Sequence, residues 1–161
     1  MSNKRPTDLS ASVHQRLLNL ANDRGEELQS LLTRYALERL LFRVGQSRHR
    51  QSLVLKGAFL FIAWEGNITR PTKDLDFLAF DDPDVARFEE LFREVAEQAS
   101  INDGIIFEAG SVRGQPTREA SLYDGIRIKL MARLGNARIP LQVDIGFGDS
   151  VEPQPGEIAY P

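Results

Sequence analysis

The stretch DLDFLAF, residues 74–80, predicts a β-strand by its alternation. Leu75 and Phe77 fall on one face and Asp74 and Asp76 on the other, because successive side chains of a strand alternate. Two ionised carboxylates side by side repel each other unless a cation lies between them, and Mg²⁺ prefers such oxygen ligands. Taken alone, however, an Asp-x-Asp pair is more often a pair of solvated loop or edge residues.

A second strand with an acid in its middle strengthens the metal-site interpretation. Residues 139–145 alternate in the same way and place Asp144 among apolar neighbours, which is a costly position for a charge without a partner. If this segment pairs with residues 74–80, three carboxylates converge, as in sites that hold two metal ions for phosphoryl or nucleotidyl transfer. Asp149, beyond the strand, is interpreted as an ordinary turn residue.

Basic residues at two places are candidates for phosphate contacts. Lys56-Gly57 lies between a short apolar segment and an apolar helix. Backbone N–H groups at a helix start bind phosphate and glycine permits its close approach; alternatively, this glycine only eases a tight turn. Arg127, Lys129 and Arg133 share one strand face. They are expected either to contact a triphosphate or RNA or to form ordinary solvated surface.

Helices and strands are expected to mix along the chain. Helical spacing of apolar residues predicts helices over residues 13–21, 26–45, 58–64 and 85–99. Apolar or alternating runs predict strands over residues 53–55, 74–80, 105–107, 126–133 and 139–145. The turn at 135–136 predicts a hairpin, and residues 110–118 are expected to form a turn or flexible loop. The expected class is an α+β (mixed α/β) fold, a small mixed sheet with helices packed on it.

Length and composition narrow the function classes. The 161 residues suffice for one ordinary domain, and 42% hydrophobic with 27% charged residues is normal for a globular protein. The chain has no cysteine and two distant histidines, so disulfides, thiol nucleophiles and a zinc site are not expected. The longest apolar run, residues 58–64, is too short to cross a bilayer, and we find no secretory signal. We therefore expect a cytoplasmic protein without membrane contact.

Three segments carry a family resemblance: LKGAFL at residues 55–60, TRPTKDLDF at 69–77 and VDIGFGD at 143–149. Together they resemble the AbiEii/AbiGii toxin family of nucleotidyltransferases, within the DNA polymerase β-like nucleotidyltransferase superfamily. The likeness runs in order from about residue 53 to the C-terminus, and the acidic blocks are its most specific part. Residues 1–50 match only in their general helical character.

The resemblance implies a nucleotidyltransferase fold and transfer of a nucleotide from an NTP, with pyrophosphate leaving. Asp74 and Asp76 match the family's metal-binding pair and Asp144 its third carboxylate, which makes these three the expected catalytic and metal-binding residues, with Mg²⁺ or Mn²⁺ as cofactor. Arg70 and Thr72 occupy the positions of a basic residue and a hydroxyl ahead of the pair. The expected NTP-binding residues are Lys56, Gly57, Arg70, Thr72 and Lys129.

A biological setting is implied as well. The chain resembles the toxin component of a bacterial toxin–antitoxin or phage-defence (abortive infection) system, with a cognate antitoxin and an RNA acceptor such as tRNA. The alternative is a non-catalytic, truncated domain that binds RNA or protein. A metal-dependent phosphohydrolase, with water as the nucleophile and the same acids, is a second enzymatic alternative.

The same resemblance suggests how the chain is divided. We expect an N-terminal helical segment (1–50), a nucleotidyltransferase core (51–150) and an exit linker (151–161). Family members continue past this point, so the chain is expected to lack their C-terminal helical half. Ala58 stands where the family usually has a glycine or serine.

Overall fold

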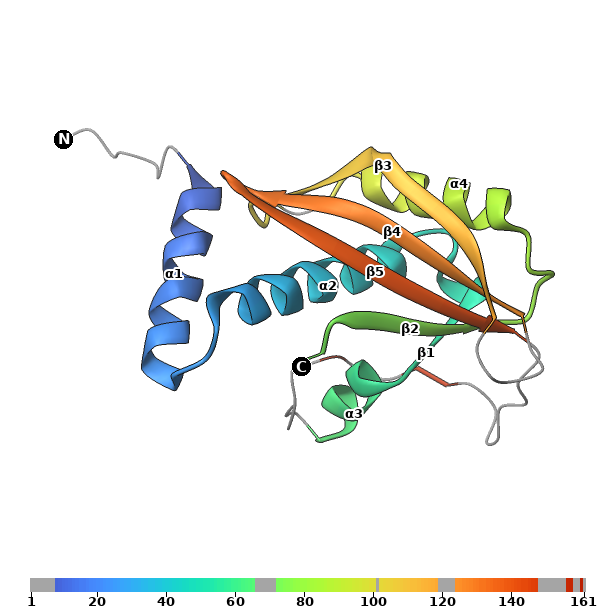
Figure 1. The fold of residues 1–161 in the computed structure, drawn as a ribbon, viewed down its shortest axis with the longest axis horizontal. Helices are drawn as coiled ribbons and strands as arrows, with labels where there is room; N and C mark the ends of the chain where they lie inside the picture. The colour runs from blue at the N-terminus through green and yellow to red at the C-terminus, as the bar shows by residue number, and fades with distance from the viewer. Residues whose placement is uncertain are drawn as a thin grey trace.

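The computed structural model describes residues 8–65, 72–100, 102–118, 124–147, 156–157 and 160. In this part of the chain a five-stranded mixed sheet carries helices against one face (Figure 1), which confirms the α+β class expected from the sequence. The elements in chain order are α1 (Leu9–Arg24), α2 (Leu28–Gln46), the 3₁₀ turn η1 (Arg50–Ser52), β1 (Leu53–Lys56), α3 (Ala58–Glu65), β2 (Asp74–Ala79), α4 (Val85–Glu97), β3 (Ile105–Arg118), β4 (Asp124–Leu134) and β5 (Ala137–Phe147). None of the described helices is long and apolar enough to cross a bilayer.

The strands lie in the order β1-β2-β5-β4-β3. The predicted hairpin is present: β4 and β5 pair antiparallel, and Gly135 adopts a φ of +60° in the turn between them. β2 pairs with β5 in parallel and with β1 antiparallel. The two strands that carry the predicted acids are therefore direct neighbours, although the β2 and β5 segments are far apart in the sequence.

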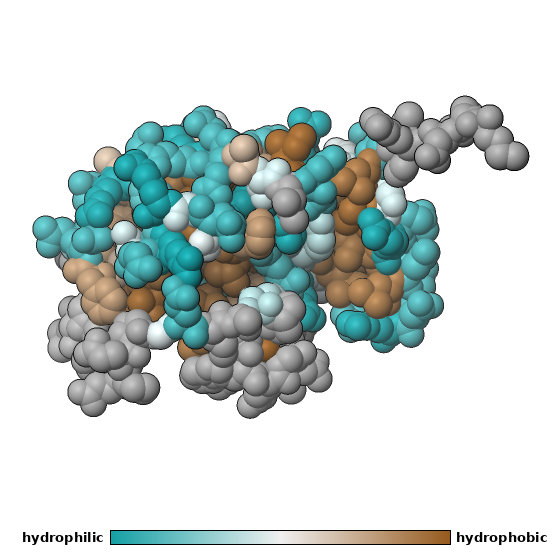
Figure 2. Space-filling view, turned by 180° about the vertical axis from the view of Figure 1, so that it is seen from behind, coloured by the Kyte–Doolittle hydropathy of each residue, from teal (hydrophilic) through white to brown (hydrophobic). Residues whose placement is uncertain are grey.

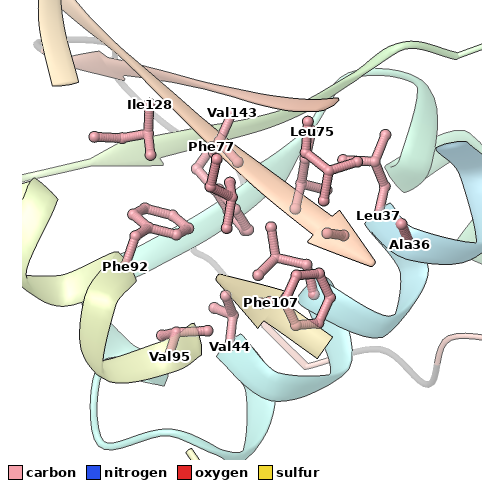
Figure 3. Close-up of a cluster of buried hydrophobic side chains, with 14 of the residues drawn as sticks. Ala36, Leu37, Val44, Leu75, Phe77, Phe92, Val95, Phe107, Ile128 and Val143 are labelled. Carbon is pink, nitrogen blue, oxygen red and sulfur yellow. The ribbon is translucent and has the colours of Figure 1, made fainter. Parts of the chain in front are cut away.

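The hydrophobic core lies between the sheet and helices α2 and α4 (Figure 3). Phe77 of β2 and Val143 of β5 are almost completely buried there, together with Leu37 of α2 and Phe92 of α4. The helical segment before residue 50 thus shares its core with the sheet, whereas the predicted domain boundary stays a prediction. Seen from behind, much of the surface is hydrophilic, with smaller hydrophobic areas between (Figure 2).

The prediction of a turn or flexible loop over residues 110–118 is wrong. β3 continues to Arg118 and pairs with β4, with a shift of register between Glu108 and Arg113. Ser111 stabilises this irregularity, because its hydroxyl accepts from the Met131 N–H at 2.8 Å and donates to the Glu108 carbonyl at 2.6 Å. Glycines occur both in turns and in bulges of edge strands, so the residue types of this segment do not separate the two structures.

Gly114 shows why a glycine is needed within this strand. A Cβ at this position would lie 2.9 Å from Val85 Cγ1 and 3.0 Å from Glu89 Cγ, both on α4. The Gly114 N–H also donates to Glu89 Oε1 at 2.8 Å. The glycine therefore serves the close approach of α4 to the sheet rather than a turn.

Only residues 156–157 and 160 of the predicted exit linker are described. The Tyr160 hydroxyl donates to Glu38 Oε1 of α2 at 2.8 Å, and its ring lies 6.4 Å from that of Phe59 in α3. Tyr160 thus joins the edge of the core, and the linker assignment itself stays a prediction.

Glu94 of α4 joins that helix to the segment before β1. Its carboxylate lies 2.5 Å from Arg48 Nη2 and 2.7 Å from His49 Nε2. Hydrogen bonds from Arg48 and then His49 lower the pKa of Glu94 from 4.5 to about 2. A carboxyl whose pKa is lower in the folded state stabilises the fold above its unfolded pKa, and that stabilisation is lost as the pH falls through the folded pKa.

Replacing Glu94 by Gln is expected to lower the melting temperature slightly at pH 7, because both pairs are partly exposed. The difference from the native chain should shrink as the pH falls from about 4.5 towards 2, which thermal unfolding at several pH values measures. Glu97→Gln is the control, since Glu97 is exposed and has no ion pair within the described residues. If the melting temperature of Glu94→Gln stays below the native value by the same amount across this pH range, Glu94 does not stabilise the fold through its ionised pairs with Arg48 and His49.

Candidate active site

A row of charged residues crosses the sheet on the face opposite the core. In the register of the strands, Lys56 of β1 is the partner of Asp76, Asp76 is the partner of Asp144, and Asp144 is the partner of Arg127 of β4. Register partners on neighbouring strands point to the same face. The structure therefore sets Asp76 directly beside Asp144, as the sequence hypothesis required.

Asp74 lies on the same face, one alternation away from Asp76. Its register partner is Gln142, whose own partner on β4 is Lys129. Burial, followed by the negative charge of Asp144, raises the pKa of the Asp74 carboxyl. Both causes disfavour negative charge at this position, as expected where several carboxylates crowd together without enough positive charge to balance them.

Among the described residues, two side chains hold the Asp144 carboxylate. Arg127 Nε donates to Oδ1 at 2.9 Å, and Gln142 Nε2 donates to Oδ2 at 3.3 Å. The sequence suggested Arg127 either as a contact to triphosphate or RNA or as solvated surface, did not connect it with Asp144, and gave Gln142 no role. The signal that could have found Gln142 is its spacing: two residues before Asp144 in a strand means the same face.

Two features require glycine at position 57: its backbone conformation and its closeness to Asp76. Its φ is +74°, a conformation that residues with a Cβ rarely adopt. A Cβ at this position would overlap Asp76 Oδ2 and lie 3.1 Å from Asp76 Cγ. The strand-to-helix turn between β1 and α3 thus needs glycine both for its shape and because the Asp76 carboxylate lies against its backbone.

The remaining predicted NTP-binding residues differ in where the structure places them. Thr72 precedes β2, and its Oγ1 is buried with no hydrogen-bond partner within the described part of the chain. Lys129 is exposed on the same face of the sheet as Asp74. Arg70 lies outside the described residues, as does Asp149.

By the chemistry of their donor atoms, the residues on this face fit a hard divalent cation. Three carboxylates share one face, the Asp76 carboxylate lies against the Gly57 backbone, and the Thr72 hydroxyl has no partner among the described residues. Such an all-oxygen donor set suits Mg²⁺ or Mn²⁺. Within the described residues, no group of three acids or histidines has the spacing of a metal site, and Arg127 and Gln142 occupy Asp144.

A family model described as the AbiEii toxin nucleotidyl transferase of a type IV toxin–antitoxin system matches residues 39–161. Two solved structures from Helicobacter pylori, JHP933 and a protein described provisionally as a nucleotidyltransferase, are 15% and 16% identical to the chain, each with a TM-score of 0.49. These matches cover 79% of this chain but 47% and 49% of the two proteins, so the chain spans about half of their length. No curated protein matches the chain.

Proposed function

The chain belongs to the AbiEii toxin family of nucleotidyl transferases, and from that premise we propose that it transfers a nucleotide from an NTP to an acceptor in a reaction that depends on a divalent metal ion. The observation that carries this proposal is the register of β2 and β5, which sets Asp76 beside Asp144 with Asp74 on the same face. Carboxylates gathered on one face are the kind of metal ligand that nucleotidyl transfer uses.

The residues of this face have different roles in the proposed reaction. Asp74, Asp76 and Asp144 would hold the metal, and Asp144 would also help to activate the acceptor hydroxyl. Bound there, Mg²⁺ or Mn²⁺ supplies positive charge for the triphosphate and lowers the pKa of the attacking hydroxyl. The turn at Gly57 allows phosphate to approach the backbone, and Lys129 adds positive charge. The acceptor oxygen bonds to the α-phosphorus as the bond from that phosphorus to pyrophosphate breaks.

RNA is the acceptor that the surface beside the acids suits. We name as the basic surface the exposed side chains of the β3–β5 strands that continue this face of the sheet: Arg113, Lys129, Arg133 and Arg138. Arg113 is the register partner of Lys129, and Arg133 is that of Arg138. Glu108 lies 3.7 Å from Arg133 and offsets part of this charge. Clustered basic side chains next to a nucleotide site favour a polyanionic acceptor.

Labelling RNA tests the proposed function directly. The protein is incubated with each radiolabelled NTP, Mg²⁺ and total RNA, and label should appear in RNA and disappear when EDTA is added. Release of phosphate or nucleotide without labelled RNA would favour the phosphohydrolase instead. RNA binding without metal dependence or labelling would favour the non-catalytic binding module.

Replacing Arg138 by Gln is expected to weaken RNA binding for all sequences alike, because a phosphate contact carries no sequence information. The slope of log K against log salt should decrease in magnitude by about 1. Fluorescence anisotropy with labelled RNA at several salt concentrations measures this slope. Arg16→Gln on α1 is the control. Equal slopes for the native and Arg138→Gln chains would show that the basic surface does not contact the RNA acceptor.

Membership of this family also supports a role as a toxin. We propose that the chain acts in the cytoplasm as the toxin of a toxin–antitoxin pair with a role in phage defence, and that a cognate antitoxin counteracts it. Expression of the chain alone should slow bacterial growth, whereas expression of the Asp76→Asn variant should not. Equal growth of cells that express the native chain and cells that express Asp76→Asn would argue against toxicity through nucleotide transfer.

A further inference from the structure

The ion pair between Arg127 and Asp144 lies within the proposed catalytic row. Arg127 Nε is 2.9 Å from Asp144 Oδ1, and the two side chains are 30% and 24% exposed. A partly buried pair is stronger than one in open solvent, because the effective dielectric constant is lower. The positive charge beside Asp144 is therefore supplied by the protein itself.

This pair and a metal ion bridging Asp76 and Asp144 would compete. Oδ1 of Asp144 accepts from Arg127 and Oδ2 accepts from Gln142, so a cation shared with Asp76 would have to share these oxygens with the two donors or displace one of them. Gln142 is a neutral donor, whereas the Arg127 guanidinium carries a positive charge that repels a cation bound at the same carboxylate. Arg127 is thus the group that sets how readily Asp144 becomes available.

We propose that Arg127 is a built-in counter-cation of Asp144 that competes with the divalent ion, and that its transfer to substrate phosphate couples metal binding to NTP binding. This inference rests on the proposed function. It makes Arg127 a positioning residue, which acts on the metal site through Asp144.

The position of Arg127 on the sheet supplies the second half of the argument. Lys129 follows it by two residues on the same strand face, towards the row of Asp74. A guanidinium that leaves Asp144 therefore stays on the face where the triphosphate is proposed to bind, and its planar array of N–H donors matches phosphate oxygens. Phosphate compensates for the lost ion pair, so each ligand should raise the affinity for the other.

Metal affinity measured without turnover tests the inference. Mn²⁺ binding is followed by electron paramagnetic resonance for the native chain and Arg127→Gln, with and without a non-hydrolysable NTP analogue. The variant should bind Mn²⁺ alone about tenfold more tightly, which corresponds to about 1.4 kcal/mol. The analogue should raise Mn²⁺ affinity clearly in the native chain and much less in Arg127→Gln.

Two kinds of control make the result specific. Lys129→Gln removes a positive charge from the same strand face without touching Asp144, and should leave the affinity for Mn²⁺ alone within about twofold of native. Asp76→Asn should abolish tight Mn²⁺ binding. If Asp76→Asn changes nothing, the proposed function fails. If Asp76→Asn abolishes binding while Arg127→Gln binds Mn²⁺ no more tightly than the native chain, only the role of Arg127 is overturned.

A measurement on the native chain covers the case in which Arg127→Gln does not fold. The side-chain Nε–Hε resonance of Arg127 should shift when Mg²⁺ and the NTP analogue are added together, because the Asp144 partner is exchanged for phosphate. A resonance that does not shift under saturating conditions would overturn the inference.

Discussion

Replacing Asp76 by Asn is expected to reduce nucleotide transfer by about 10³-fold, equivalent to about 4 kcal/mol of transition-state stabilisation. Asp76 stands between Lys56 and Asp144 in the register, and its carboxylate lies against the Gly57 turn. An amide has the size of the carboxylate but not its charge, so the metal loses a ligand while the turn keeps its neighbour. Labelling of RNA from a radiolabelled NTP measures the loss.

The same substitution is expected to change the free energy of unfolding by less than about 1 kcal/mol, because partly exposed charge interactions are weak. Loss of activity without loss of stability separates a chemical role from a structural one. Asp82→Asn is the matched control, since Asp82 is exposed just beyond the end of β2, and it should retain native activity. Near-native activity of Asp76→Asn would exclude Asp76 as a metal ligand.

Replacing Gly57 by Ala is expected to lower both stability and activity, activity more strongly. The φ of +74° costs a residue with a Cβ about 1–2 kcal/mol. The new Cβ would also overlap Asp76 Oδ2, and the carboxylate is the part that can move away. A displacement of about 1 Å in a catalytic group costs about 100-fold in rate. Urea unfolding and the RNA-labelling assay measure the two effects.

Gly45→Ala provides the control for this substitution. Gly45 lies in the last turn of α2, its φ is not positive, and nothing lies within 4 Å of a Cβ built there. Its replacement should leave stability unchanged or raise it by less than about 1 kcal/mol. If Gly57→Ala behaves like Gly45→Ala in both measurements, the Gly57 turn does not position Asp76.

Local pattern was sufficient to predict most of the fold. The alternation of Leu75 and Phe77 with Asp74 and Asp76 predicted β2 and the face that it buries, and both are confirmed. The sequence could not predict the strand order, because pairing of β2 with β5 depends on long-range packing. The strand predicted over residues 105–107 is confirmed as the start of β3, whereas the turn predicted over 110–118 is wrong because glycines in a bulged edge strand resemble a turn in sequence.

The candidate site could be predicted only in part. The facing positions of Asp74 and Asp76 follow from strand periodicity alone, whereas the placement of Asp144 beside them required the parallel register. Gly57 was found by its position before a helix, but its contact with Asp76 is a tertiary feature. The pairing of Arg127 with Asp144 likewise depends on the β4–β5 register.

A crystal structure of the chain grown with Mn²⁺ and a non-hydrolysable NTP would show whether the three carboxylates form a metal site, because anomalous scattering locates the metal without any assumption about its ligands. We expect a Mn²⁺ peak that is coordinated by Asp76 and Asp144, with Asp74 in the same ligand shell and the nucleotide phosphates completing it. Mn²⁺ and nucleotide bound elsewhere, with Arg127 still paired to Asp144, would contradict it.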